Sequence, residues 1–225
     1  MNFKFNYIAI TNNFKLAEQL DRAGVQQIMV DLENIGKSDR QKSTNAVINY
    51  HQVSDIVRIK SHVNKAKIIC RINGFYTGTV SEINSAIEAG ADSIIIPMIR
   101  NKEEAEEAVN YVKYPPLGKR GVGLNRAQKY GTAFDSYKDW IKNNAVVIAQ
   151  IEHIEAVHNL EEIFSVPGID GIIVGPYDLS ASMGYPGEYD REDVKLALEK
   201  IDAITKKLNK PLGFHIVESD HNKVL

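Results

Sequence analysis

The stretch AVVIAQIEHIEAVHNLEEIFSVPGIDGIIVGPYDLSASMGYPG, residues 145–187, contains two apolar runs separated by a segment with a helical pattern. The runs AVVIAQI and GIIVGP are nearly continuous in Ile and Val, which is typical of parallel strands buried on both faces. Glu152 follows the first run and Asp178 follows the second. Because the carboxyl ends of parallel strands lie at one edge of a sheet, we predict that these two carboxylates hold a divalent cation.

The same order of a helix, a glycine stop and an apolar run occurs elsewhere in the chain. It reads AEQLDRAGVQQIMVDLE at 17–33, INSAIEAGADSIIIPMI at 83–99 and LEEIFSVPGIDGIIVGPYD at 160–178. A glycine at the end of each helix suits the left-handed cap conformation, and the glycines concerned are Gly24, Gly90 and Gly168. This repeat predicts an α/β fold made of successive strand–helix units.

Counting these units predicts a barrel. Seven runs are expected to form strands, at 7–10, 27–32, 67–72, 93–98, 146–151, 171–176 and 211–216. Helices are expected between most of them, for instance near 14–23, 80–89, 101–112 and 191–208. We therefore expect a TIM (β/α)8-type barrel, a single domain over residues 1–225, with the eighth strand and last helix missing from this chain. A doubly wound sheet is disfavoured, since the first predicted turn is not glycine-rich.

Composition narrows the class of protein. The net charge is −2, and neither a basic excess nor a charged run points to nucleic acid or to a membrane surface. No segment approaches the roughly 20 apolar residues that span a bilayer, and the N-terminus does not resemble a signal peptide. A single cysteine, Cys70, fits a reducing cytoplasm, and we expect a cytoplasmic protein. Cys70 precedes Arg71 and should face the strand–helix packing.

Polar residues at the predicted strand ends suggest the chemistry. Two carboxylates form an oxygen-rich site suited to Mg²⁺ or Mn²⁺, and neither a His pair nor a Cys pair is present at zinc spacing. Arg71, on a neighbouring strand, could pair with a substrate carboxylate or a developing enolate. An acidic residue at a strand end is also commonly a helix cap or an ion-pair partner, so this pattern leaves both interpretations open.

Three longer stretches resemble a known family. They are AGADSIIIPMIRNKEEAEEAVNYVKYPP (89–116), YPPLGKRGVGLNRAQKYG (114–131) and QIEHIEAVHNLEEIFSVPGIDGIIVGPYDLSASMGYPG (150–187). They are similar to the HpcH/HpaI aldolases of the phosphoenolpyruvate/pyruvate barrel superfamily. The resemblance implies a divalent metal on Glu152 and Asp178 and a pyruvate oxygen on Arg71. It places Gln150 beside the metal. It places the substrate carboxylate at the backbone N–H groups around Tyr177 and Asp178, with Gly175 and Pro176 as the other substrate-binding residues.

The resemblance also implies a reaction and its partners. The family cleaves or forms a C–C bond of a 2-oxo acid through a pyruvate enolate, with an aldehyde as the second substrate, and its members are commonly homo-oligomers, trimers or hexamers. This chain departs from the family at one position, where Asn34 in DLEN replaces a histidine that works as an acid–base group. Asn cannot transfer protons, so His215 is the candidate replacement. The other histidines are interpreted as surface residues: His51, His62, His153, His158 and His221.

Two other functions remain open. The motif DLEN resembles the citrate lyase β-subunit group, which would make the chain a C–C lyase of an acyl-CoA thioester, of the citryl- or malyl-CoA type. A barrel that binds a ligand without catalysis is the other alternative, since the family histidine is absent. Retro-aldol turnover with added metal separates the aldolase from the binding protein, and dependence on acyl-CoA identifies the lyase.

Overall fold

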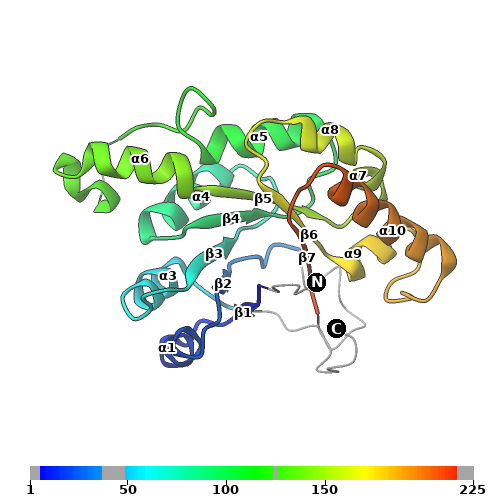
Figure 1. Ribbon diagram of the computed structural model, residues 1–225, viewed down its shortest axis with the longest axis horizontal. Helices are drawn as coiled ribbons and strands as arrows, with labels where there is room; N and C mark the ends of the chain where they lie inside the picture. Colours follow the sequence, from blue (N-terminus) through cyan, green and yellow to red (C-terminus); the bar gives the residue numbers. More distant parts are fainter. Residues whose placement is uncertain (1–5, 37–48, 124–125, 217–225) are drawn as a thin grey trace. The chain divides into compact units, whose positions relative to one another are not determined.

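The computed structural model of the chain describes residues 6–36, 49–123 and 126–216. The chain forms two compact units, Met1–Pro97 with Ala108–Val147, and Met98–Glu107 with Ile148–Leu225. Strand order follows the chain from β1 to β7, and every pairing described below is parallel. The α/β fold with an all-parallel sheet that the repeat predicted is therefore confirmed (Figure 1).

Unit 1 is built on four complete strands in sequence order. Their bounds are β1 (Ile8–Ile10), β2 (Gln27–Asp31), β3 (Lys67–Arg71) and β4 (Ser93–Ile96). The helices after the first three strands are α1 (Phe14–Arg22), α3 (Val53–Lys60) and α4 (Thr79–Ala89). Strands β2 to β4 are buried almost throughout, as expected of strands covered on both faces. The register pairs Asp31 with Arg71, which places two charged residues opposite each other at the carboxyl ends of β2 and β3.

Hydrogen bonds to Asp21 stabilise the amino-terminal side of unit 1. The Asp21 carboxylate accepts hydrogen bonds from three consecutive backbone N–H groups, at 2.9 Å from Asn64, 3.0 Å from Lys65 and 2.6 Å from Ala66. Burial by itself raises the pKa of Asp21, but these three donors and the nearby Lys65 charge outweigh it and leave the pKa below its ordinary value. The loop before β3 is thereby attached to the end of α1.

Unit 1 continues after β4 with the second half of α5 (Lys102–Val112). It then contains the short 3₁₀ segment η1 (Arg126–Gly131), α6 (Phe134–Asn144) and the first residues of β5 (Val146–Ile151). Between α5 and α6 the described residues are 113–123 and 126–133, and η1 lies in the second of these ranges.

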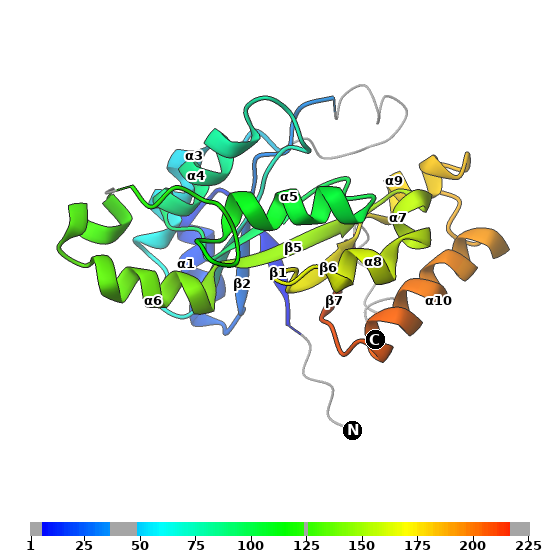
Figure 2. The same cartoon turned by 90° about the horizontal axis from the view of Figure 1, so that it is seen from above.

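Unit 2 contains the rest of β5, β6 (Gly171–Val174) and β7 (Leu212–Phe214). Ile151 pairs with Val174, and Val174 pairs with Phe214. The helices are α7 (Ile154–His158), α8 (Leu160–Ser165), α9 (Pro176–Ser182) and α10 (Glu192–Lys207). Helices α7, α8 and α10 pack against one another (Figure 2).

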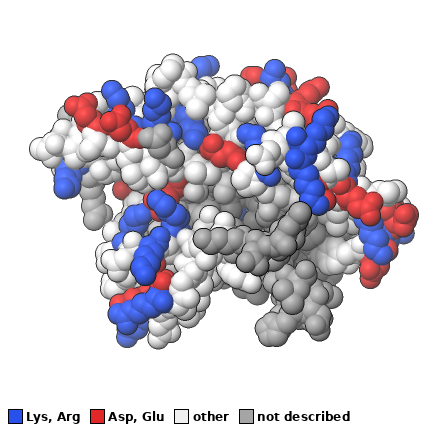
Figure 3. Space-filling model, in the orientation of Figure 1, with Lys and Arg blue, Asp and Glu red and all other residues white. Residues whose placement is uncertain are grey.

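All seven predicted strands are found within the described residues, and most end one or two residues earlier than predicted. The three glycines predicted to end helices have positive φ angles, +88° at Gly24, +115° at Gly90 and +103° at Gly168. In the described parts of the chain no helix is both long and apolar enough to cross a membrane. Basic and acidic side chains are interspersed on the face drawn in Figure 3, in keeping with the net charge of −2.

Candidate functional site

In unit 1 the carboxyl ends of β2 and β3 are joined by a buried ion pair. Asp31 is completely buried, and its carboxylate accepts two hydrogen bonds from Arg71, at 2.8 Å from Nε and 2.7 Å from Nη2. The Oε2 atom of Glu33 lies 3.4 Å from the same Nε. A two-point contact of this kind fixes the plane of the guanidinium as well as its position. Arg71 thus lies where the sequence placed it, with its orientation set by Asp31.

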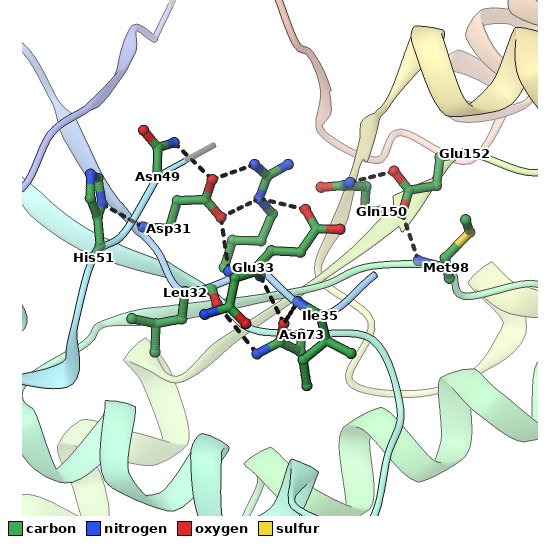
Figure 4. A network of polar contacts seen from close by, with 12 residues as sticks. Asp31, Leu32, Glu33, Ile35, Asn49, His51, Asn73, Met98, Gln150 and Glu152 are labelled. Carbon is green, nitrogen blue, oxygen red and sulfur yellow. Dashed lines mark hydrogen bonds and ion pairs between the residues drawn. The ribbon is translucent and has the colours of Figure 1, made fainter. Parts of the chain in front are cut away.

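Two further residues contact Asp31, and the sequence analysis did not single out either of them as functional. Asn49 donates from Nδ2 to the Asp31 carboxylate at 2.9 Å, and the backbone N–H of Asp31 donates to Nδ1 of His51 at 3.0 Å (Figure 4). The interpretation of His51 as a surface residue was wrong, because its ring is half-buried and bound to the end of β2. No periodic pattern signals this contact, which joins residues 20 positions apart.

The loop after β2 is attached to the end of β3 by Asn73. Its Oδ1 accepts the N–H groups of Asn34 and Ile35, both at 2.9 Å, and its Nδ2 donates to Glu82 at 2.8 Å (Figure 4 shows Asn73 beside Ile35). The Asn34 residue is exposed and is attached to this network through its backbone.

Two titratable groups in this region have shifted pKa values. Burial raises the pKa of Glu82, and hydrogen bonds from Asn73 and Tyr76 only partly offset that effect. Burial, together with the negative charges of Glu82 and Asp31, raises the pKa of the Cys70 thiol well above its ordinary value. A thiol that stays protonated is a poor nucleophile, which agrees with the packing role predicted for Cys70.

In unit 2 the residue after β5, Glu152, is also almost completely buried. Its Oε2 accepts a hydrogen bond from Nε2 of Gln150 at 2.5 Å, and its Oε1 accepts the backbone N–H of Met98 at 3.0 Å (Figure 4). Gln150 is buried as well. The structure therefore brings together Gln150 and Glu152, which the sequence analysis named as neighbours in the site.

Met98 adopts an unusual backbone conformation to make this contact. Its φ angle is +59°, in the left-handed region that non-glycine residues rarely occupy. Such a conformation costs on the order of 1 kcal/mol or more and persists where the surrounding structure requires it. The strand predicted at 93–98 ends early, at Ile96, and Met98 turns its N–H toward Glu152.

Gly175 lies directly against the same carboxylate. A Cβ atom built on Gly175 would lie 2.6 Å from Oε2 of Glu152, 3.0 Å from its Cβ and 3.5 Å from Nε2 of Gln150. The φ angle of Gly175 is −98°, so the glycine is required for space and not for backbone conformation. The first residue after β6 thus forms a cradle for Glu152 that a side chain would fill.

Asp178 lies in the first turn of α9, which begins at Pro176. The strand predicted at 171–176 was wrong in its end, because β6 ends at Val174 and α9 starts two residues later. Pro176 suits the first turn of a helix, where a missing N–H leaves no carbonyl unpaired. Tyr177 follows it, and its ring lies 3.5 Å from the position that a Cβ of Gly187 would occupy.

His215 immediately follows β7 in unit 2. Its ring is half-buried, and its backbone N–H donates to the carbonyl of Val174 at 3.2 Å. Of the other histidines, His158 is exposed as predicted, whereas His62 and His153 are partly buried and contact nearby backbone groups. His221 lies outside the described residues.

The donor set of unit 2 can be compared with the needs of a metal ion. Within residues 6–36, 49–123 and 126–216, no group of three or more His, Cys, Asp or Glu side chains is arranged to hold one. Nevertheless, Gln150 lies within β5, Glu152 directly follows β5, and Asp178 lies in the helix after the paired strand β6. Hard cations such as Mg²⁺ and Mn²⁺ prefer oxygen ligands completed by water. The residue types present therefore fit a hard divalent cation.

The comparison with known sequences decides the family. The sequence pattern of the family described as HpcH/HpaI aldolase/citrate lyase matches residues 7–224, nearly the whole chain. This chain belongs to the HpcH/HpaI aldolase/citrate lyase family. The resemblance predicted from the motifs at 89–187 is thereby confirmed.

Individual members of the family are similar to this chain over part of their length. A hydroxypyruvate/pyruvate aldolase of Sagittula stellata is 42% identical over 133 residues, 59% of this chain and 52% of that protein. A 2-keto-3-deoxy-L-rhamnonate aldolase of Escherichia coli is 32% identical over 173 residues, 76% of this chain and 61% of that protein. The chain thus spans about half to three-fifths of the length of these curated relatives.

The fold also has solved counterparts. The crystal structure of an HpcH/HpaI aldolase/citrate lyase family protein from Burkholderia cenocepacia superposes with a TM-score of 0.80 at 25% identity. The match covers 97% of this chain and 82% of that one.

Proposed function

We propose that this family member is a divalent-metal-dependent aldolase that cleaves or forms a C–C bond of a 2-oxo acid through a pyruvate enolate. The observation that carries the proposal is the environment of Glu152: a buried carboxylate held by Gln150 and by the strained Met98, beside a glycine with no room for a side chain. A buried carboxylate and a strained backbone both cost folding free energy, and such features cluster at sites that bind ligands. Relatives named as aldolases of pyruvate and of a 2-keto acid support the same reaction class.

In the proposed site Glu152 and Asp178 hold Mg²⁺ or Mn²⁺. Such a cation, when bound, polarises the 2-oxo group and stabilises negative charge on the enolate. Gln150 orients Glu152 through its 2.5 Å hydrogen bond. The backbone N–H groups of Tyr177 and Asp178 receive the substrate carboxylate, a role favoured by their place in the first turn of α9, whereas the N–H of Gly175 donates to the carbonyl of Ile151 at 3.1 Å and Pro176 has none.

Arg71 is proposed to bind an oxygen of the 2-oxo acid and to lower the energy of the enolate. Its guanidinium keeps its charge at every physiological pH and is held in one plane by Asp31. Asn34 cannot move a proton, so we retain His215, which follows β7 at the carboxyl end of the sheet, as the proposed acid–base group. A titrating imidazole suits this task near neutral pH.

We also propose that the parallel strands belong to a TIM barrel that forms a single domain and a homo-oligomer, and that pyruvate and an aldehyde are the substrates. Strand order that follows the chain, with helices between the strands, supports the barrel. The oligomer is tested by light scattering during size-exclusion chromatography, where a single chain mass would contradict it.

The test of the reaction is exchange of the pyruvate methyl protons in D₂O, followed by NMR, with and without Mn²⁺ or Mg²⁺. The assay requires enolate formation but no knowledge of the aldehyde. Metal-dependent exchange that is lost in Glu152→Gln and in Asp178→Asn, with folding shown by circular dichroism, is the expected result. No exchange by a folded, metal-loaded protein would contradict the proposal, and cleavage seen only with acyl-CoA substrates would favour the lyase suggested by DLEN.

A further inference from the structure

The end of β2 is held by an unusually complete set of contacts around one residue. The Asp31 carboxylate accepts two hydrogen bonds from Arg71, one from Asn49 Nδ2 at 2.9 Å and one from the backbone N–H of Glu33 at 3.2 Å. Its own backbone N–H donates to Nδ1 of His51 at 3.0 Å. Asn49 and His51 both come from the segment that precedes α3, so one short segment holds Asp31 by its side chain and by its main chain.

The contact with His51 replaces a sheet hydrogen bond. Strand β1 ends at Ile10, and the last bond of its ladder runs from the N–H of Thr11 to the carbonyl of Met29. A parallel ladder continued by one step would pair the Asp31 N–H with the carbonyl of Thr11. That N–H is given instead to the imidazole of His51. The side chain of His51, which lies outside the sheet, thus accepts the N–H that a longer β1 would have bound.

This contact also determines the protonation of the imidazole. A backbone N–H can only donate, so Nδ1 of His51 accepts and carries no proton. The proton of the neutral ring is then on Nε2. Asparagine offers an oxygen acceptor at a similar distance from the backbone, whereas phenylalanine keeps the ring shape and offers none.

We infer that His51 and Asn49 are positioning residues for Arg71, acting through Asp31. The inference rests on the proposed function, in which Arg71 receives an oxygen of the 2-oxo acid. Asp31 binds the Nε–Nη2 edge of the guanidinium at 2.8 and 2.7 Å, so the direction of the whole planar group follows the position of the Asp31 carboxylate. A carboxylate whose main chain is released from His51 can rotate or shift, and the guanidinium moves with it.

The start of α3 keeps the segment in place. The carboxylate of Asp55 accepts the backbone N–H of Gln52 at 2.9 Å, and the N–H of Asp55 donates to the carbonyl of Gln52 at 2.9 Å. This reciprocal pair fixes the first turn of the helix directly after His51. The positioning device is therefore attached to a packed helix, whose Ile56 and Ile59 are fully buried.

The experiment compares His51→Phe with His51→Asn in the full chain, and His158→Phe, an exposed histidine of unit 2, serves as the matched control. Pyruvate affinity is measured by calorimetry in the presence of Mn²⁺, and Mn²⁺ affinity is measured separately. We expect His51→Phe to bind pyruvate about five- to tenfold more weakly, the loss typical of one hydrogen bond of about 1–1.4 kcal/mol. His51→Asn should stay within about twofold of wild type, with Mn²⁺ affinity unchanged in all three variants.

Several results would overturn the inference. Unchanged pyruvate affinity in His51→Phe would remove His51 from the positioning of Arg71. Equal losses in His51→Phe and His51→Asn would mean that the acceptor atom is not what matters. A parallel loss of Mn²⁺ affinity and folding would assign His51 a purely structural role.

A second readout separates this inference from the proposed function. The Nε–H resonance of Arg71 in ¹⁵N NMR reports its hydrogen bond to Asp31 whether or not pyruvate binds. If wild type neither binds pyruvate nor exchanges its protons, the proposed function fails, and the resonance still decides the inference. Slow solvent exchange in wild type and His51→Asn, lost in His51→Phe, supports it, whereas slow exchange in all three proteins overturns it.

Discussion

Replacing Gly175 by alanine tests the position of the Glu152 carboxylate with the smallest possible change. The new methyl carbon would lie 2.6 Å from Oε2 of Glu152, which is 0.8 Å short of the 3.4 Å at which ordinary contact begins. Its distance to the Cβ of Glu152 would be 3.0 Å, so rotation of the carboxylate alone does not relieve both contacts. The whole Glu152 side chain must therefore move, and this movement disturbs its hydrogen bonds with Gln150 and Met98.

The expected effect is on the metal and not on the fold. The φ angle of −98° at Gly175 is open to alanine, and Gly→Ala at such a site gains about 0.4–1 kcal/mol by restricting the unfolded chain. Overpacking of the neighbours costs about 1–3 kcal/mol, so the two effects partly cancel in the free energy of unfolding. Displacing the carboxylate that is proposed to hold the metal should weaken Mn²⁺ binding about 10- to 100-fold, the range found when partners of metal ligands are changed.

Mn²⁺ affinity is measured by calorimetry or by electron paramagnetic resonance, together with metal-dependent proton exchange of pyruvate. Gly74→Ala is the matched control, because a Cβ there would meet only the carbonyl of Pro97, at 3.8 Å. We expect wild-type affinity in the control and parallel losses of affinity and exchange in Gly175→Ala. Wild-type Mn²⁺ affinity in a folded Gly175→Ala protein would refute the reasoning that places the metal on Glu152.

Three other changes have expected outcomes. Arg71→Lys keeps the charge but loses the two-point contact with Asp31, so the free energy of unfolding should fall by about 1–3 kcal/mol and pyruvate affinity should drop; calorimetry with unchanged affinity would exclude a role of the guanidinium geometry. Asp21→Asn should cost about 1–3 kcal/mol at pH 7, as measured by urea unfolding. The folded-state pKa of Asp21 is lowered, so its charge stabilises the fold at pH values above its ordinary pKa of 3.8. This contribution is lost as the pH falls through the lowered pKa. A difference in unfolding free energy between wild type and variant that persists at still lower pH would contradict this assignment. Asp92→Asn weakens the contact with Lys60, at 2.8 Å, and should lower the free energy of unfolding by about 1–3 kcal/mol, whereas an unchanged urea midpoint would show that the contact contributes little.

Local pattern determined most of the fold. Apolar β-branched runs and helix-ending glycines depend on contacts between residues near in sequence, so strand positions and the glycines of positive φ were predictable. The residues at which strands end were less predictable, because the hydrogen bonds of a sheet stop where the neighbouring strand stops. The strand predicted at 171–176 is the example, since it ends at Val174 and Pro176 already begins α9.

The candidate site was also predictable from the sequence only in part. Residue types at strand ends, with the family motifs, named Glu152, Gln150 and Arg71 from the sequence, and the structure joins the first two by a 2.5 Å hydrogen bond. The contact of Met98 with Glu152 links residues 54 positions apart and depends on a left-handed backbone that propensity disfavours. The sequence around His51 contains no pattern that predicts its contact with the backbone of Asp31, because that contact depends on where β1 ends.

The sequence by itself determined the class of fold, the family and the residue types at the strand ends, because these follow from short-range pattern and motif. Only the tertiary structure decided which groups hold the functional side chains: Asp31 for Arg71, Met98 for Glu152 and His51 for the main chain of β2. The physical reason is that buried polar groups must find hydrogen-bond partners, and those partners are set by proximity in space across many residues of chain.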